Sequence, residues 1–202
     1  MMKSMLTVAA ASLVMFSVSS ASAQSLGEGS KTFSIDSGKS TIKFVSDAPA
    51  EKIQGTANGK INGKVTINLA NVAETSGAIS FPVDSMKTGN KLRDRHMAGK
   101  DWLNGKKNPN ITFTITGIEG GKSDGKAVTG VAVGKVNING KDADARANIE
   151  LKYAASKGLF KVEIKNFVVK LANHDVAGKK GVVGNKVGET IEITGFIYGK
   201  TK

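Results

Sequence analysis

The sequence predicts an all-β protein built from antiparallel strands, because its composition and its residue patterning agree. The 202 residues include 24 glycines but only 3 prolines, and aromatic residues make up 5% of the chain. Short segments in which apolar and polar residues alternate recur along the whole chain, which is the pattern of half-buried strands. Their spacing fits a barrel or a sandwich.

The first 23 residues have the layout of a secretory signal peptide. One positive residue, Lys3, precedes an apolar run over 6–18, and the small-residue triplet Ala21-Ser22-Ala23 follows that run. The run is too short for a permanent membrane anchor, and the chain has no cysteine that a lipid could modify. We therefore expect residues 1–23 to be removed on export to the bacterial periplasm, and residues 24–202 to form one soluble domain.

The chain is strongly basic, with 29 Lys and Arg, 17 Asp and Glu, and a formal net charge of +12. Such an excess indicates anionic partners. Because export is expected, we favour anionic head groups, lipopolysaccharide or pyrophosphate and expect no nucleic acid. A surface that only keeps the protein soluble is the alternative, since most charges are single lysines scattered along strands. Without cysteine, stability has to come from packing and backbone pairing, which favours a closed sheet.

Nine segments are predicted strands because apolar residues recur in them at every second position. They are 32–35, 41–46, 53–69, 77–83, 111–116, 128–138, 145–153, 159–169 and 189–198. In the segment 159–169 the apolar positions are even-numbered up to Ile164 and odd-numbered from Phe167 on, which predicts a β-bulge near Lys165-Asn166. Asn62-Gly63 and Asn139-Gly140 each have the composition of a two-residue hairpin turn.

One short helix is predicted between Asn90 and Leu103, with Asn104-Gly105 as its stop signal. A helical period separates its apolar and basic residues, placing Leu92, His96, Met97 and Leu103 on one side and Lys91, Arg95 and Lys100 toward water.

Residues that could bind a metal do not form a convincing constellation. The chain has two histidines, His96 and His174, on separate elements, whereas a zinc site needs three or four converging ligands. The phosphate-binding Gly-x-x-x-x-Gly-Lys-Ser/Thr loop is absent. We therefore expect a protein that is not an enzyme and has no metal or cofactor.

Four motifs lie close together in the middle of the chain. They are Ser85-x-x-Thr88, Arg93-Asp94-x-His96, Asp101-Trp102-Leu103 and Asn108-Pro109-Asn110-Ile111-Thr112-Phe113. Together they resemble the YceI-like family of exported lipid-binding proteins. The resemblance implies a lipocalin-like antiparallel β-barrel of about eight strands with one short helix. It also implies one long strand over 55–67, which makes Gly63 a bend or close-approach position and leaves Asn139-Gly140 as the expected hairpin turn.

A barrel of about eight strands is either filled by side chains or just wide enough for one slender ligand. Small residues alternate along two predicted strands, at Gly55, Ala57 and Gly59 and at Val128, Gly130, Ala132 and Gly134, which favours a cavity that a lipid tail could fill. The expected ligand is a polyisoprenoid, a quinone or a fatty-acid derivative. The residues expected to bind it are Ile42, Phe44, Ile79, Phe81, Met97, Trp102, Ile111, Phe113, Ile149, Leu151, Val162 and Ile164, although each of them could equally pack the core.

Basic residues around the predicted helix are expected at the rim of the barrel, where an anionic head group would sit. They are Lys87, Lys91, Arg95, Lys106 and Lys107, and transient contact with an anionic membrane surface is a further possibility. Arg93 and Asp94 are expected to hydrogen-bond to neighbouring backbone, with Met97, Trp102 and Leu103 closing the core. A direct ligand role for Met97 or Trp102 is the alternative.

These observations predict a periplasmic protein that sequesters or carries a long-chain isoprenoid or similar amphiphilic lipid in an apolar barrel cavity. One alternative is a periplasmic structural or stress-response protein with a filled core and no lipid ligand. A second is a small outer-membrane barrel, although the aromatic girdles of that class are not evident.

Overall fold

The computed structural model describes residues 26–124 and 126–201, so the expected signal peptide lies outside the described residues. The strands are β1 (Ser30–Ile35), β2 (Thr41–Ala48), β3 (Glu51–Asn58), β4 (Asn62–Asn68), β5 (Ser76–Pro82), β6 (Met86–Lys87), β7 (Asn110–Ser123), β8 (Ala127–Ile138), β9 (Lys141–Ala154), β10 (Leu159–Lys170) and β11 (Thr190–Thr201). The α-helix is α1 (Lys91–Met97), and the 3₁₀ helices are η1 (Val72–Glu74), η2 (Val83–Ser85), η3 (Ala155–Lys157) and η4 (Leu171–His174).

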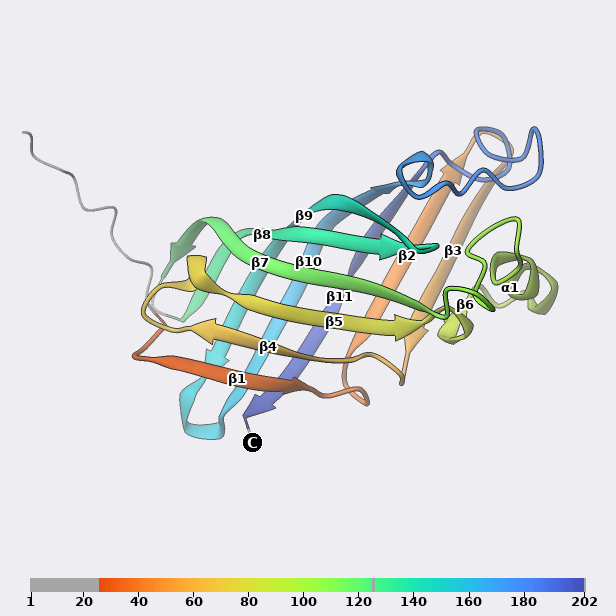
Figure 1. Ribbon diagram of the computed structural model, residues 1–202. Helices are drawn as coiled ribbons and strands as arrows, with labels where there is room; N and C mark the ends of the chain where they lie inside the picture. The colour runs from red at the N-terminus through yellow and green to blue at the C-terminus, as the bar shows by residue number, and fades with distance from the viewer. Residues whose placement is uncertain (1–25, 125, 202) are drawn as a thin grey trace, which may run out of the picture.

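Eight strands close into an antiparallel barrel, which confirms the predicted fold class (Figure 1). Hydrogen-bonded neighbours follow the order β1-β4-β5-β7-β8-β9-β10-β11, and the pairing of Phe33 with Thr201 joins β11 back to β1. The strands β2, β3 and β6 continue the sheet from β11 beyond this ring. The β2–β3 hairpin and α1 lie at one end of the barrel, which we call the open end.

The expected continuous strand over 53–69 is wrong, because the chain bends in its middle. The strand β3 ends at Asn58 and β4 begins at Asn62, and Gly59 between them has a left-handed φ of 73°. The bend changes the pairing partners: β3 pairs with β2 and β6, whereas β4 pairs with β1 and β5. The alternation of apolar residues resumes after the bend, so it did not mark the break.

The expectations for the two Asn-Gly pairs are confirmed. Gly63 lies inside a strand pair, where a Cβ atom would be 2.0 Å from the carbonyl oxygen of Ala78. Asn139 and Gly140 connect β8 to β9 with positive φ values of 52° and 74°, as a two-residue hairpin turn requires.

The predicted β-bulge is also confirmed, since the pairing of β10 with β11 shifts register between Ile164 and Phe167. The shift keeps apolar side chains on the inner face along the whole of β10: Phe167 is buried and Ile164 packs against the core. The barrel end away from α1 is filled by aromatic rings, with Phe33 edge-to-face against Phe160 at 4.8 Å and against Tyr153 at 5.6 Å between ring centroids.

The helix α1 is shorter than predicted. The Asn90 side chain caps it by accepting hydrogen bonds from the backbone N–H groups of Leu92 and Arg93. Leu92 is 52% exposed, so the expected apolar side of the helix is not fully buried. The residues after Met97 form turns instead of helix, because Leu103 N–H bonds back to the Met97 carbonyl group. In the part of the chain that the structure describes, no helix is long and apolar enough to cross a membrane.

Candidate functional site

An apolar cavity of about 530 Å³ occupies the open end of the barrel. Three parts of the chain form its walls: the inner faces of β2, β3 and β11, the helix α1 with the turns that follow it, and the loop over 175–189. Their main apolar contributions are Phe44, Ile53, Met97, Trp102, Leu103, Val176, Val182, Val187 and Ile191. The volume lies within the range of about 300–1,000 Å³ that is usual for small-molecule sites.

Hydrogen bonds at its base hold the loop over 175–189 against β2. The hydroxyl group of Ser46 accepts a buried hydrogen bond of 2.8 Å from the backbone N–H of Gly188. The N–H of Ala50 donates to the carbonyl oxygen of Asn185 at 3.0 Å. The cavity wall that this loop forms is therefore attached to the strand that carries Phe44.

Two charged residues of α1 fix the helix in place. The guanidinium of Arg93 donates to the carboxylate of Glu51 on β3, and both side chains border the cavity. Asp94 accepts hydrogen bonds from the backbone N–H and the hydroxyl of Thr88, at 2.8 and 2.7 Å. Asp94 therefore has the expected architectural role, whereas Arg93 pairs with a side chain instead of backbone.

The pKa of Asp94 lies below its ordinary value. Burial raises this pKa, but the two hydrogen bonds from Thr88 and the nearby charges of Lys87 and Arg93 outweigh the effect of burial. The carboxylate is thus ionised at neutral pH and remains a strong acceptor at the start of α1.

The barrel interior below the cavity is largely filled. A second, wholly apolar space of about 60 Å³ remains there, between β4, β5, β7, β9 and β10. The small residues that suggested a cavity are covered by neighbours: a Cβ atom on Gly55 would be 2.2 Å from the Phe44 ring, and one on Gly134 would be 1.9 Å from the Thr114 carbonyl oxygen. Among the described residues, the lipid-sized space is therefore confined to the open end and does not continue along the whole barrel.

The residues expected to bind a ligand divide into three groups. Those that line the open-end cavity are Phe44, Met97 and Trp102. Those that line the inner space are Ile79, Phe113, Ile149, Leu151, Val162 and Ile164. Ile42, Phe81 and Ile111 belong to the packed core and border neither space.

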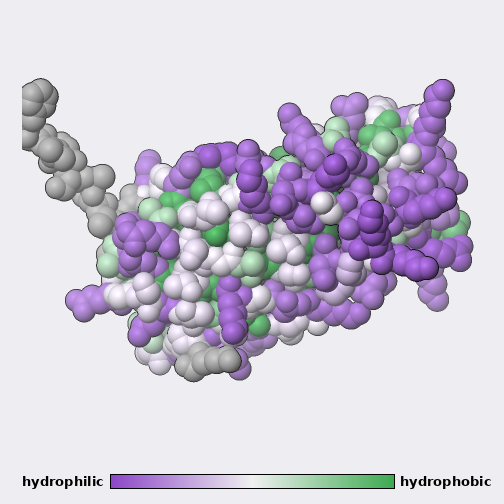
Figure 2. Space-filling view, viewed as in Figure 1, coloured by the Kyte–Doolittle hydropathy of each residue, from purple (hydrophilic) through white to green (hydrophobic). Residues whose placement is uncertain are grey.

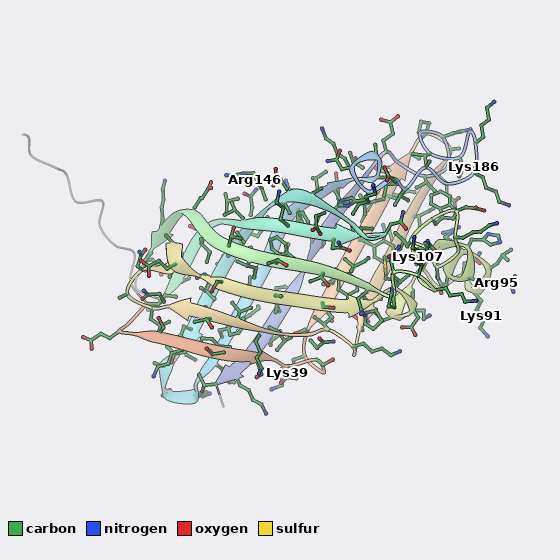
Figure 3. The ribbon with its side chains drawn as sticks, viewed as in Figure 1. Lys39, Lys91, Arg95, Lys107, Arg146 and Lys186 are labelled. Carbon is green, nitrogen blue, oxygen red and sulfur yellow. The ribbon has the colours of Figure 1, made fainter. Side chains whose placement is uncertain are left out.

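The basic residues expected at the rim are exposed, and none of them lines the cavity; they are Lys87, Lys91, Arg95, Lys106 and Lys107. Arg93 and Lys186 border it instead. Figure 2 shows the hydrophilic surface that gathers over the open end, and Figure 3 shows Lys91, Arg95 and Lys186 there. The basic end that the sequence suggested is present, but different cations border the cavity.

Sequence reasoning missed most of the contribution of the segment from Leu171 to Ile191. This segment supplies Leu171, Val176, Val182, Lys186, Val187 and Ile191 to the cavity. In the sequence, the apolar residues of this segment are scattered among glycines and lysines, so they were not recognised as part of a binding site. The one available signal was the recurrence of valines, at 176, 182, 183 and 187, in a loop rich in glycine and lysine.

The two histidines lie in different surroundings. His96 is exposed beside the cavity, whereas His174 is buried and its Nδ1 lies 2.9 Å from the carbonyl oxygen of Lys141, to which it donates. Among the described residues, no three His, Asp or Glu side chains converge as a metal site would require.

Two serine-containing strings have the spacing of nucleophile motifs but not their structural context. In the string Gly121-Lys122-Ser123-Asp124-Gly125, Ser123 is the last residue of β7. The next strand, β8, is antiparallel to β7, so Ser123 does not lie at a strand-to-helix elbow. In Ser40-Thr41-Ile42-Lys43 the hydroxyl group of Ser40 is buried. It donates to the Asp36 carbonyl and accepts from the Tyr198 N–H, which gives it a structural role.

Comparison with known sequences gives two matches. A family model described as YceI-like domain matches residues 33–197. A curated UPF0312 protein of Photorhabdus laumondii is 30% identical to this chain over 90 residues, which are 45% of this chain and 44% of that protein. The match thus spans less than half of the curated relative.

Solved structures share the fold at low sequence identity. BcnA of Burkholderia cenocepacia is 22% identical, with a TM-score of 0.66 over 81% of this chain and 98% of that one. A polyisoprenoid-binding domain from Saccharophagus degradans, implicated in plant cell wall breakdown, is 14% identical, with a TM-score of 0.66 over 84% and 98%. The YceI protein of Campylobacter jejuni is 21% identical, with a TM-score of 0.60 over 77% and 89%.

Proposed function

We propose that this chain, which belongs to the YceI-like family over residues 33–197, is an exported protein that binds a long-chain isoprenoid or similar amphiphilic lipid. Residues 1–23 would direct it to the periplasm and be removed, leaving 24–202 as the binding domain. Its role would be to sequester or carry the lipid and not to transform it chemically.

The cavity at the open end is the observation that carries this proposal. A space of about 530 Å³ with a mainly apolar lining leaves hydrophobic surface in contact with water, and a hydrocarbon chain would bury that surface favourably. Each buried methylene group contributes roughly 0.8 kcal/mol, so a tail of a few isoprene units supports micromolar binding without directional contacts.

The filled interior limits how the tail is held. Because the inner space is about 60 Å³, the tail would lie mainly across the open end, between Phe44, Trp102 and Val187, and not along the barrel axis. The Saccharophagus degradans domain that shares this fold is a polyisoprenoid-binding domain, which supports the ligand class.

The proposal is tested on protein purified from its own periplasm without detergent. Native mass spectrometry should show a mass increment, and organic extraction should release an amphiphile of the same mass. Protein that carries no lipid, and that also fails to bind added farnesol, would favour the alternative of a structural or stress-response protein.

A further inference from the structure

A second groove lies beside the cavity, on the outer side of α1. It has a volume of about 470 Å³ and runs between the end of α1 and the loop over 175–189. Three residues, His96, Trp102 and Val182, line both the groove and the cavity. The groove is therefore a direct neighbour of the apolar site, and the Trp102 side chain borders both of them.

The groove has a basic lining. Arg95, Lys100 and Lys179 all border it, and all three are exposed. Among the described residues, none of these three cations forms an ion pair with a carboxylate. One carboxylate, that of Asp101, also borders the groove, so the lining keeps a net positive charge.

Most exposed lysines elsewhere in the described chain also form no ion pair, but seven of them do. Lys52, Lys60 and Lys135, for example, lie within 4 Å of a carboxylate oxygen. Unpaired cations from two separate segments meet in the groove, next to an apolar cavity. An anion bound there would form charge-assisted hydrogen bonds without displacing an existing partner.

We infer that the groove formed by Arg95, Lys100 and Lys179 binds the anionic head, a phosphate or carboxylate, of the amphiphile whose tail occupies the cavity. The inference rests on the proposed function and narrows its ligand class: the protein prefers anionic amphiphiles to neutral ones with the same tail. Figure 3 shows Arg95 on α1 at the open end, where such a head group would lie.

The test compares two probes with identical tails, farnesol and farnesyl phosphate. Trp102 is the only tryptophan and lines both sites, so its fluorescence reports binding of either probe. The groove variant is R95Q/K100Q/K179Q. The matched control, K91Q/K106Q/K107Q, removes the same charge from exposed lysines that border neither site.

We expect the wild type to bind farnesyl phosphate about tenfold or more tighter than farnesol, as hydrogen bonds to a charged group imply. The groove variant should lose this preference while its affinity for farnesol stays within about twofold, and the control should keep most of the preference. A tenfold excess of inorganic phosphate over the probe should leave farnesyl phosphate bound, because the tail supplies most of its affinity.

Five outcomes would overturn the inference. A preference that survives in the groove variant, or that falls equally in the control, would show that the groove is not the binding site of the head group. Displacement of farnesyl phosphate by inorganic phosphate alone would identify a site for free phosphate. Binding of farnesol without preference would leave the proposed function standing, whereas failure of both probes to bind would overturn the two together.

Discussion

Gly178 lies directly against the indole ring of Trp102: a Cβ atom on Gly178 would be only 2.5 Å from Cη2 of that ring. Gly178 also has a left-handed φ of 61°. This contact joins the loop over 175–189 to the turn after α1, two of the three walls of the cavity. The shape of the cavity therefore depends on a residue without a side chain at position 178.

Gly178→Ala should destabilise the protein by about 2–4 kcal/mol, from the left-handed backbone and the overpacking against Trp102 together. Gly181→Ala is the matched control, since Gly181 has a φ of 75° but nothing within 4 Å of the added Cβ. It should lose only about 1–2 kcal/mol. Urea unfolding measures the loss of stability in both variants. A shifted Trp102 emission maximum is expected for Gly178→Ala alone. Equal losses would show that the Trp102 contact is unimportant.

Val187→Phe should weaken farnesol binding about tenfold, because the larger ring takes up cavity space and excludes about two methylene groups of roughly 0.8 kcal/mol each. Val168→Phe, on the exposed outer side of β10, is the control and should leave the affinity unchanged. Titrations followed by Trp102 fluorescence give both values. Unchanged binding in Val187→Phe would place the tail somewhere other than the open-end cavity.

Asp94→Asn should lower stability at neutral pH by about 1 kcal/mol, because the amide is a weaker acceptor for the two Thr88 donors. The folded pKa of Asp94 is depressed, so its contribution is present above the unfolded value of about 3.8 and is lost as the pH falls through the folded pKa. The difference in free energy of unfolding between wild type and variant should therefore become smaller at about pH 3.

Urea midpoints at pH 7 and at about pH 3 measure this gap. Asp101→Asn removes the same charge from the turn after α1, where no hydrogen bond to Thr88 is involved. It should lower stability at pH 7 by less than Asp94→Asn does. A gap for Asp94→Asn that stays constant with pH would mean that ionisation of Asp94 does not stabilise the start of α1.

Asn139→Ala should destabilise the β8–β9 turn by about 2–3 kcal/mol, and Asn139→Gly by less. Both variants lose the hydrogen bonds that Asn139 makes with Asn108 and with the His174 carbonyl oxygen. Only alanine is also strained at the φ of 52°. Thermal or urea unfolding of the pair separates the two effects, and identical losses would show that backbone strain is negligible there.

The sequence features that predicted the fold correctly depend only on residues that are close together in the sequence. Asn139-Gly140 adopts its turn because asparagine and glycine tolerate positive φ, and the change of phase between Ile164 and Phe167 requires a bulge wherever the strand pairs. The bend at Gly59 escaped detection because it changes strand partners, which local alternation does not encode.

The sequence by itself determined that the chain forms strands with one apolar face, that a basic helix interrupts them, and that the motifs around Arg93 and Trp102 resemble one family. Only the tertiary structure decided where the empty space lies. Alternation shows which side chains point inward but not whether neighbours fill the gaps between them: the Phe44 ring occupies the space beside Gly55, whereas Val187, far away in sequence, helps to enclose the cavity. Packing depends on contacts between distant segments, and those contacts exist only once the barrel has closed.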